Sequence, residues 1–305
     1  MLHPVPAFEL TLIAGDRKIE ARDTATERLM RVKFWGVRGS TPTPQAENLR
    51  YGGNTSCVEV RLQDNVYIFD CGTGFRLLGH KLAHEFQDKP LEAHVFVSHF
   101  HWDHIQGIPF FGPLYDSPGS RFSFHSSSRN RNLKRVLEEQ MAAPYFPVNM
   151  NEMKAHRDFH DIEEGRVALD DAVTIQTAWL NHPQGCLGFR IESKEGILVY
   201  ATDNEPGDAT FDKNVRRLAA GADVLIYDAQ YLPEEYEARK RGWGHSHWRE
   251  AINVVMESGA KELVLFHHDP DHNDRCIDAV VKEARNYYPR LRAASEGLEI
   301  PLGGS

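Results

Sequence analysis

Residues 94–106 constrain the fold more than any other part of the sequence. They begin with an apolar run at positions 95–97, which predicts a buried strand. Directly after this strand, residues 99–104 read His-Phe-His-Trp-Asp-His and place three imidazoles and one carboxylate within six positions. Imidazole nitrogens and carboxylate oxygens suit zinc and similar first-row metals. Four such groups at a strand end favour a metal site over a polar loop that is histidine-rich by chance.

The spacing within this run indicates how the ligands could be shared. His99 and His101 are two positions apart, so in an extended chain their side chains point the same way and both could hold one ion. A turn after them could direct Asp103 and His104 towards a second ion. The run therefore predicts two neighbouring metal positions.

Residues 98–104 resemble the His-x-His-x-Asp-His signature of the metallo-β-lactamase fold superfamily. The resemblance implies an α/β (α+β) fold, an αββα sandwich of two mixed β-sheets flanked by helices, with the metals at one edge. It says little about the substrate, because hydrolases of lactams, thioesters, lactones and phosphodiesters share the signature. The substrate class must therefore be inferred from other residues of the site.

Other polar residues follow predicted strands in the same way, and the superfamily pattern assigns them roles. His182, Asp203 and His267 each follow an apolar run. The implied first metal site contains His99, His101 and His182, the second contains Asp103, His104 and His267, and Asp203 bridges both. His267 is preferred to His268 because it directly follows the apolar run at positions 263–266. The resemblance implies two divalent ions per chain, with zinc expected and manganese or iron as alternatives.

Residues 244–247, Gly-His-Ser-His, resemble a motif of the phosphodiesterase branch, which includes ribonuclease Z and the phosphodiesterases of phosphoribosyl cyclic phosphate and cyclic nucleotides. In that branch a histidine outside the metal shell contacts the phosphate and helps the leaving oxygen depart. We expect His245 to take this catalytic and substrate-binding role, at the start of a helix whose free amides favour phosphate. Ser246 is expected to contact the substrate, although it could instead cap the helix.

Two further residues have open assignments. Asn54 follows two glycines, so a turn role competes with a substrate contact. Asp70, in Asp-Cys-Gly-Thr-Gly, is favoured as a turn carboxylate that caps backbone amides rather than as a catalytic group. Asp103 is expected to orient the attacking hydroxide that two metals would generate.

Charge and chain length between motifs argue for a small substrate. The net charge is −9 and the pI is about 6.0, which does not predict an extended nucleic-acid surface. Only one predicted hairpin separates His182 from Asp203, where ribonuclease Z usually carries a long basic arm. The leading hypothesis is a dinuclear phosphodiesterase for a small cyclic phosphodiester such as a 3′,5′-cyclic nucleotide. The alternatives are a ribonuclease Z-type nuclease, a thioester or lactone hydrolase, and a metal-binding protein without activity.

The remaining sequence predicts the organisation of the chain. Residues 1–29 are expected to be an N-terminal extension with a strand at 8–13, and residues 30–305 to form the hydrolase domain. Residues 151–165 are predicted to be a polar surface segment, and residues 248–257 a helix that ends at Gly259. Four widely spaced cysteines and the absence of a long apolar run predict a cytoplasmic protein without a membrane span. We expect a homodimer.

Overall fold

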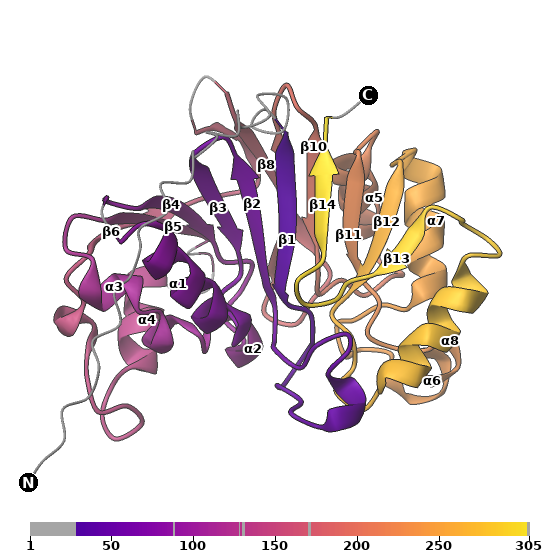
Figure 1. Ribbon diagram of the computed structural model, residues 1–305. Helices are drawn as coiled ribbons and strands as arrows, with labels where there is room; N and C mark the ends of the chain where they lie inside the picture. The colour runs from indigo at the N-terminus through magenta and orange to yellow at the C-terminus, as the bar shows by residue number, and fades with distance from the viewer. Residues whose placement is uncertain (1–28, 88, 128, 130–131, 170–171, 304–305) are drawn as a thin grey trace, which may run out of the picture.

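The computed structural model describes residues 29–87, 89–127, 129, 132–169 and 172–303. Two seven-stranded mixed sheets pack face to face and carry helices on both outer faces (Figure 1). This arrangement confirms the predicted αββα sandwich. The N-terminal extension and its strand at 8–13 lie outside the described residues, so the boundary after residue 29 stays a prediction.

The first sheet joins an antiparallel part to a parallel part. Its strands, in spatial order, are β14 (Glu299–Leu302), β1 (Met30–Gly36), β2 (Cys57–Leu62), β3 (Asn65–Phe69), β4 (Glu92–Phe96), β5 (Arg121–Ser126) and β6 (His156–Asp161). The neighbours from β14 to β3 run antiparallel, and those from β3 to β6 run parallel. Parallel neighbours end at the same edge of a sheet, which places the residues after β3 and β4 side by side.

The second sheet repeats this plan. Its strands, in spatial order, are β13 (Leu291–Ala293), β12 (Glu262–Phe266), β11 (Val224–Asp228), β10 (Ile197–Ala201), β9 (Cys186–Glu192), β8 (Thr174–Leu180) and β7 (Gly165–Ala168). Strands β10 to β13 are parallel, and β7 to β10 are antiparallel. Because β8 and β10 are both antiparallel to β9, they end at the same edge. The chain therefore leaves β8, β10, β11 and β12 at one edge of the sheet.

Helices cover both outer faces. In Figure 1, α1 and α4 lie over the first sheet, whereas α5, α7 and α8 lie over the second. The helices are α1 (Gly74–Glu85), α2 (Trp102–Ile105), α3 (Pro113–Asp116), α4 (Leu133–Gln140), α5 (Ala209–Ala219), α6 (Pro233–Glu235), α7 (Trp248–Ser258) and α8 (Asp274–Ala284). Short 3₁₀ turns occupy η2 (Ala46–Asn48), η3 (Ile108–Phe110) and η4 (Met150–Glu152), and η5 (Tyr236–Lys240) is a π-helical turn. Among the described residues, none of these helices has the length and apolar character needed to cross a bilayer.

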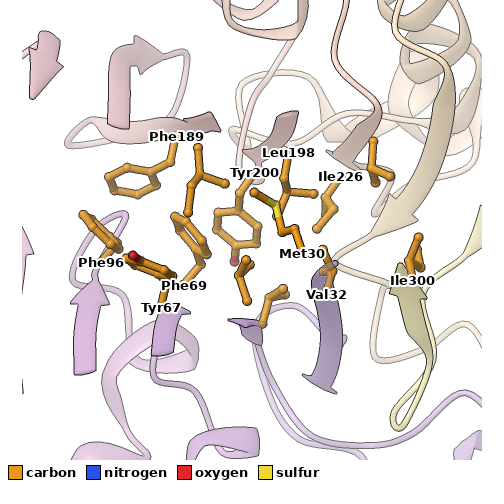
Figure 2. Close-up of a cluster of buried hydrophobic side chains, with 14 of the residues drawn as sticks. Met30, Val32, Tyr67, Phe69, Phe96, Phe189, Leu198, Tyr200, Ile226 and Ile300 are labelled. Carbon is orange, nitrogen blue, oxygen red and sulfur yellow. The ribbon is translucent and has the colours of Figure 1, made fainter. Parts of the chain in front are cut away.

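A hydrophobic core of aliphatic and aromatic side chains fills the space between the sheets (Figure 2). The ring of Phe69 lies 5.3 Å from that of Phe96 and 5.6 Å from those of Phe189 and Tyr200. Burying one such side chain stabilises a fold by roughly 1.5–3 kcal/mol. The hydroxyl of Tyr200 leaves this apolar layer and donates to Asp70 at 2.8 Å. The core thus fixes a carboxylate that lies at the strand ends.

One sequence prediction was incomplete about local structure, and one was wrong. Within the segment 151–165, predicted as polar surface, residues 156–161 form β6, a mostly polar edge strand that pairs only with β5 among the described strands. Helix α7 begins at Trp248, with His247 as its N-cap accepting from the amide of Glu250 at 3.3 Å, so neither His245 nor Ser246 opens it. Its other end agrees with the prediction, because Gly259 adopts a left-handed φ of 70°.

Candidate metal centre

The structure brings all seven predicted metal ligands together where β4, β8, β10 and β12 end. Two groups of three have ligand atoms within 4.8 Å of one another: His99, His101 and His182 in the first group, and Asp103, His104 and His267 in the second. In the first group, Nε2 of His182 lies 3.0 Å from Nδ1 of His101. In the second group, Nε2 of His267 lies 3.3 Å from Nε2 of His104 and 3.2 Å from Oδ2 of Asp103.

Asp203 lies between the two groups. Its Oδ1 is 3.8 Å from Nε2 of His99 and 3.7 Å from Nε2 of His182. Its Oδ2 is 3.4 Å from Nε2 of both His104 and His267. Each carboxylate oxygen therefore faces a different group, which is the geometry that a bridging ligand requires.

The donor set fits divalent metal ions. Nε2 of His99 is buried and has no hydrogen-bond partner among the described residues. A buried nitrogen left in this state costs free energy unless a cation takes up its lone pair. Imidazole nitrogens and carboxylate oxygens together suit zinc, manganese or iron. The cluster thus offers three nitrogen ligands on one side, a mixed nitrogen and oxygen set on the other, and Asp203 in common.

The protonation tendencies of the two groups differ. Burial lowers the pKa of His99 well below its ordinary value and that of His182 to about 4, so both favour the neutral form that binds metals. Burial also acts on His104 and His267, but the carboxylates of Asp103 and Asp203 prevail and raise the pKa of both imidazoles. Cation binding at the second group would therefore release protons.

Residues behind the ligands fix their orientation. Oδ2 of Asp70 lies 2.7 Å from Nδ1 of His104, while its Oδ1 accepts from the amide of Ser98 at 2.7 Å. Asp70 therefore caps a backbone amide, as predicted, and also holds an imidazole. Oε1 of Gln230 lies 2.9 Å from Nδ1 of His267, an interaction that the sequence did not predict. Such outer contacts set the tautomer and direction of metal-binding histidines.

Three of the strand-end residues have an unusual backbone conformation. Asp70 after β3, Asp203 after β10 and His267 after β12 have φ values of 60°, 56° and 63°. Positive φ is disfavoured for residues other than glycine and costs of order 1–3 kcal/mol at each position. The tight turns direct these side chains into the cluster, and the surrounding fold compensates for the strain.

His245 borders the cluster without belonging to either group of three. Its Nδ1 donates to Oδ2 of Asp228 at 2.8 Å. Its ring stacks on His267 at 5.0 Å and lies edge-on to His182 at 5.1 Å. With Nδ1 engaged by Asp228, Nε2 is the atom available to a substrate. His245 therefore presents Nε2 beside the candidate metal ligands, where it could exchange a proton or hydrogen bond with a bound group.

Asp228, which was not predicted as a site residue, organises this side of the site. Its fully buried carboxylate accepts from the backbone amides of Asp203, Gln230 and Ser246, each at 3.0 Å, as well as from His245. Asp228, His245, Asp203 and His267 also lie close enough to hold an ion. However, the four hydrogen bonds already occupy Asp228, so we assign it a positioning role. Its place at the end of the parallel strand β11 was the signal that could have identified it.

The loop before His245 requires glycine at position 244, because a larger residue would clash with its neighbours. Gly244 has a φ of 85°, and a Cβ there would lie 2.3 Å from Pro183 and 2.4 Å from the ring of His182. Glu205 fixes the same loop, because its Oε2 accepts from the amide of Gly244 at 2.8 Å. The carbonyl of Gly244 in turn lies 2.8 Å from Nδ1 of His182. The candidate metal ligand His182 and the loop before His245 are therefore held together.

Three other candidates lie outside the ligand cluster. The hydroxyl of Ser246 is buried, so the predicted substrate contact from its side chain does not agree with the structure. The side-chain amide of Asn54 donates to both carboxylate oxygens of Glu296 at 3.1 Å, which matches the turn role rather than a substrate contact. Nε2 of His268 donates to the carbonyl of Ala294 at 3.0 Å, which leaves His267 as the histidine in the cluster.

Comparisons with known proteins agree with this architecture. A family described as a beta-lactamase superfamily domain matches residues 65–268. Ribonuclease Z of Haloarcula marismortui is 25% identical over 88% of this chain and 96% of its own length. The metallo-beta-lactamase fold protein YhfI from Bacillus subtilis is 19% identical and covers 90% of this chain and 99% of its own with a TM-score of 0.66. The short form of human tRNase Z is 20% identical, with a TM-score of 0.63 over 88% of this chain and 98% of its own.

Proposed function

The chain belongs to the beta-lactamase superfamily, and from this premise we propose that this metal-dependent hydrolase is a phosphodiesterase with two metal ions. Its substrate in this proposal is a small cyclic phosphodiester, with a 3′,5′-cyclic nucleotide as the specific prediction. Zinc is the expected metal, with manganese or iron as alternatives. The ligands are those of the two groups described above, with Asp203 shared between them.

Each residue has a defined part in this hydrolysis. Two divalent ions, when bound, supply Lewis acidity and a nucleophile at neutral pH. Oδ2 of Asp103 accepts from the amide of Ser40 at 2.7 Å, which fixes the carboxylate that would orient the attacking group. Asp203 contacts both groups of ligands and so fixes the distance between them. His245 donates a proton or hydrogen bond from Nε2 to the departing oxygen, while Asp228 holds its ring.

The pairing of His245 with Asp228 is the observation that carries the proposal. A ribose oxygen is a poor leaving group and needs a proton as the P–O bond breaks. A thiolate leaves without one, so a thioester hydrolase would not need a buried carboxylate and a closely packed glycine to hold a histidine beside the metal ligands. These features favour a phosphodiester over a thioester.

The size of the substrate is argued from the chain between His182 and Asp203. The hairpin of β9 and β10 fills this interval, with Leu198 paired to Ile191. That interval leaves no room for the long arm expected of a tRNA-binding enzyme. The net charge of −9 also disfavours binding to a long polyanion. A small diester needs neither feature.

Cleavage of precursor tRNA is the second candidate, because the curated relative cited above is a ribonuclease Z. A panel assay on metal-reconstituted protein separates the possibilities. It compares kcat/KM for cyclic AMP, cyclic GMP, 2′,3′-cyclic nucleotides, precursor tRNA, a thioester and a lactone. We expect the highest value for a cyclic nucleotide. A highest value for precursor tRNA would establish the ribonuclease instead, and one for the thioester or lactone would exclude both. The homodimer and the cytoplasmic location stay predictions.

A further inference from the structure

We propose that a cavity beside His99 binds the nucleobase of the substrate, a specificity that rests on the proposed phosphodiesterase function. The cavity has a volume of about 460 Å³. It is bordered by His99 and Phe100, which follow β4, and by Trp179, Gln184 and Gly185, which lie on either side of His182 in the sequence. His99 belongs both to the ligand cluster and to the border of the cavity, so the two are adjacent.

Part of the wall belongs to the loops that carry the candidate metal ligands, and the rest comes from the end of β5 and from α4. Phe100 lies between His99 and His101, and Gln184 follows His182 after one proline. The two loops are joined where the amide of Leu187 donates to the carbonyl of Ser98 at 3.0 Å. The turn beyond His182 is sharply bent, since Gln184 has a φ of 68°. The cavity is thus held at a fixed distance from the first metal group.

The chemistry of the walls suits a planar heterocycle. Phe100 and Trp179 are half-buried aromatic rings, and base–aromatic stacking is a general means of holding nucleotides. The guanidinium of Arg129 lies over the ring of Trp179, 5.0 Å from its centre, so a cation covers one face of this ring and leaves the other face for a base. Ser127, Gln184 and Glu139 add hydroxyl, amide and carboxylate groups at the border. Such groups can pair with the polar edge of a base.

The volume sets the size of the ligand. A cavity of about 460 Å³ lies in the range of small-molecule sites, roughly 300–1,000 Å³. It admits one nucleoside but not a folded RNA. Hydroxyl, amide and carboxylate groups at its border distinguish it from a slot for a purely apolar acyl chain. The cavity therefore connects the proposed chemistry to a nucleotide rather than to a lipid-like thioester.

The test uses two diesters with the same leaving group, thymidine 5′-(p-nitrophenyl) phosphate and methyl p-nitrophenyl phosphate. Only the first carries a nucleoside. Trp179→Leu removes the stacking surface and keeps an apolar side chain. Gln184→Asn shortens the amide and keeps a residue that tolerates positive φ. Tyr287→Leu, at a residue that is 60% exposed and does not border the cavity, is the matched aromatic control.

We expect Trp179→Leu to lower kcat/KM for the thymidine diester by about ten- to hundredfold and to change that for the methyl diester by less than about threefold. Gln184→Asn should give a smaller loss with the same selectivity, about three- to tenfold. The control should leave both values within about twofold. Equal losses on both diesters, or no loss on either, would overturn the assignment of the cavity.

Calorimetric binding of thymidine 5′-monophosphate to the metal-loaded protein separates this inference from the proposed function. If wild type binds the nucleotide and Trp179→Leu weakens binding by about tenfold or more, the cavity assignment stands even when no diester is hydrolysed. If diesters are hydrolysed while nucleotide binding is the same in wild type and both variants, the phosphodiesterase stands and the cavity assignment fails.

Discussion

Two groups of histidines meet at the first sheet, one in the loop after β4 and one on the face of the sheet itself, and their surroundings differ. The metal ligands follow β4 and face the carboxylates of Asp103 and Asp203. The second group, which we call the histidine stack, consists of His94, His125 and His160 on β4, β5 and β6. Nδ1 of His94 lies 3.0 Å from Nε2 of His125, and the ring of His125 lies 4.8 Å from that of His160.

The difference is one of counter-charge. His125 stacks on Phe96 at 4.7 Å, and burial followed by the neighbouring histidines lowers its pKa to about 3. In the metal cluster, carboxylates raise the pKa of His104 instead. Imidazoles that face carboxylates at strand ends can bind cations, whereas imidazoles on the face of a sheet among aromatic rings act as packing groups. The count of histidines alone does not distinguish the two.

The largest effect should come from Asp203→Asn. Asparagine tolerates the positive φ at this position, so the variant removes the shared charge and spares the backbone. We expect the metal content to fall from about two ions per chain to below one, with at least about a 10³-fold loss of kcat. Elemental analysis checks this, and His125→Phe in the histidine stack should keep both ions. Equal loss of metal in Asp203→Asn and His125→Phe would contradict the distinction between the metal cluster and the histidine stack.

His245→Ala should damage the chemistry and spare the metals. Losing a positioned proton donor typically lowers kcat by about 10²–10⁴-fold. The loss should be largest for a ribose leaving group and smaller for p-nitrophenolate, which departs without a proton. The measurement is kcat on both substrate types together with metal content. Equal losses on both would mean that His245 binds phosphate without protonating the leaving oxygen.

Asp70→Asn should weaken metal binding without removing a ligand. The carboxylate lies 2.7 Å from Nδ1 of His104 and fixes its direction. Loss of such an outer contact usually lowers metal affinity by about 10–100-fold. Competition with a chelator of known affinity measures the change at the second group. An unchanged affinity would show that Tyr200 and Ser98 suffice to hold this region.

The smallest effect concerns stability at acid pH. Between about pH 3 and 6.5 the unfolded chain protonates His125 and the folded chain does not, so stability falls as the pH falls through this window. His125→Phe should remove this contribution, at most about 1.4 kcal/mol per pH unit. Urea unfolding of metal-free protein at pH 4.5 and 7 compares the free energy of unfolding of the variant with that of wild type. The histidines of the metal cluster are present in both proteins, so their contribution to the pH dependence is the same. The same pH dependence in both proteins would contradict the assignment.

The sequence predicted what depends on local pattern. Apolar runs followed by His99, Asp203 and His267 predicted both the strands and the residues that meet at their ends. Strand β6 was not predicted because its residues are mostly polar and lack the alternation of apolar and polar residues that marks a half-buried strand. The N-cap of α7 was misplaced because Asp228, distant in sequence, holds Ser246 in a non-helical conformation.

The contacts that orient the ligands had no local signal. Gln230 and Glu205 are ordinary polar residues in the sequence, and only the topology places them against His267 and Gly244. The cavity beside His99 likewise needs side chains from several separate segments. Chemistry carried by one motif can be predicted from sequence, whereas chemistry that depends on the shape between loops requires the fold.

The left-handed backbone conformations of Asp70, Asp203 and His267 place their side chains in the site but lower the conformational stability of the fold. Glycine at any of the three would relieve unfavourable torsion, since it adopts positive φ without a steric penalty. Glycine would, however, also remove buried hydrogen bonds, such as those from Tyr200 and His104 to Asp70, so the torsional gain is opposed by the loss of these contacts.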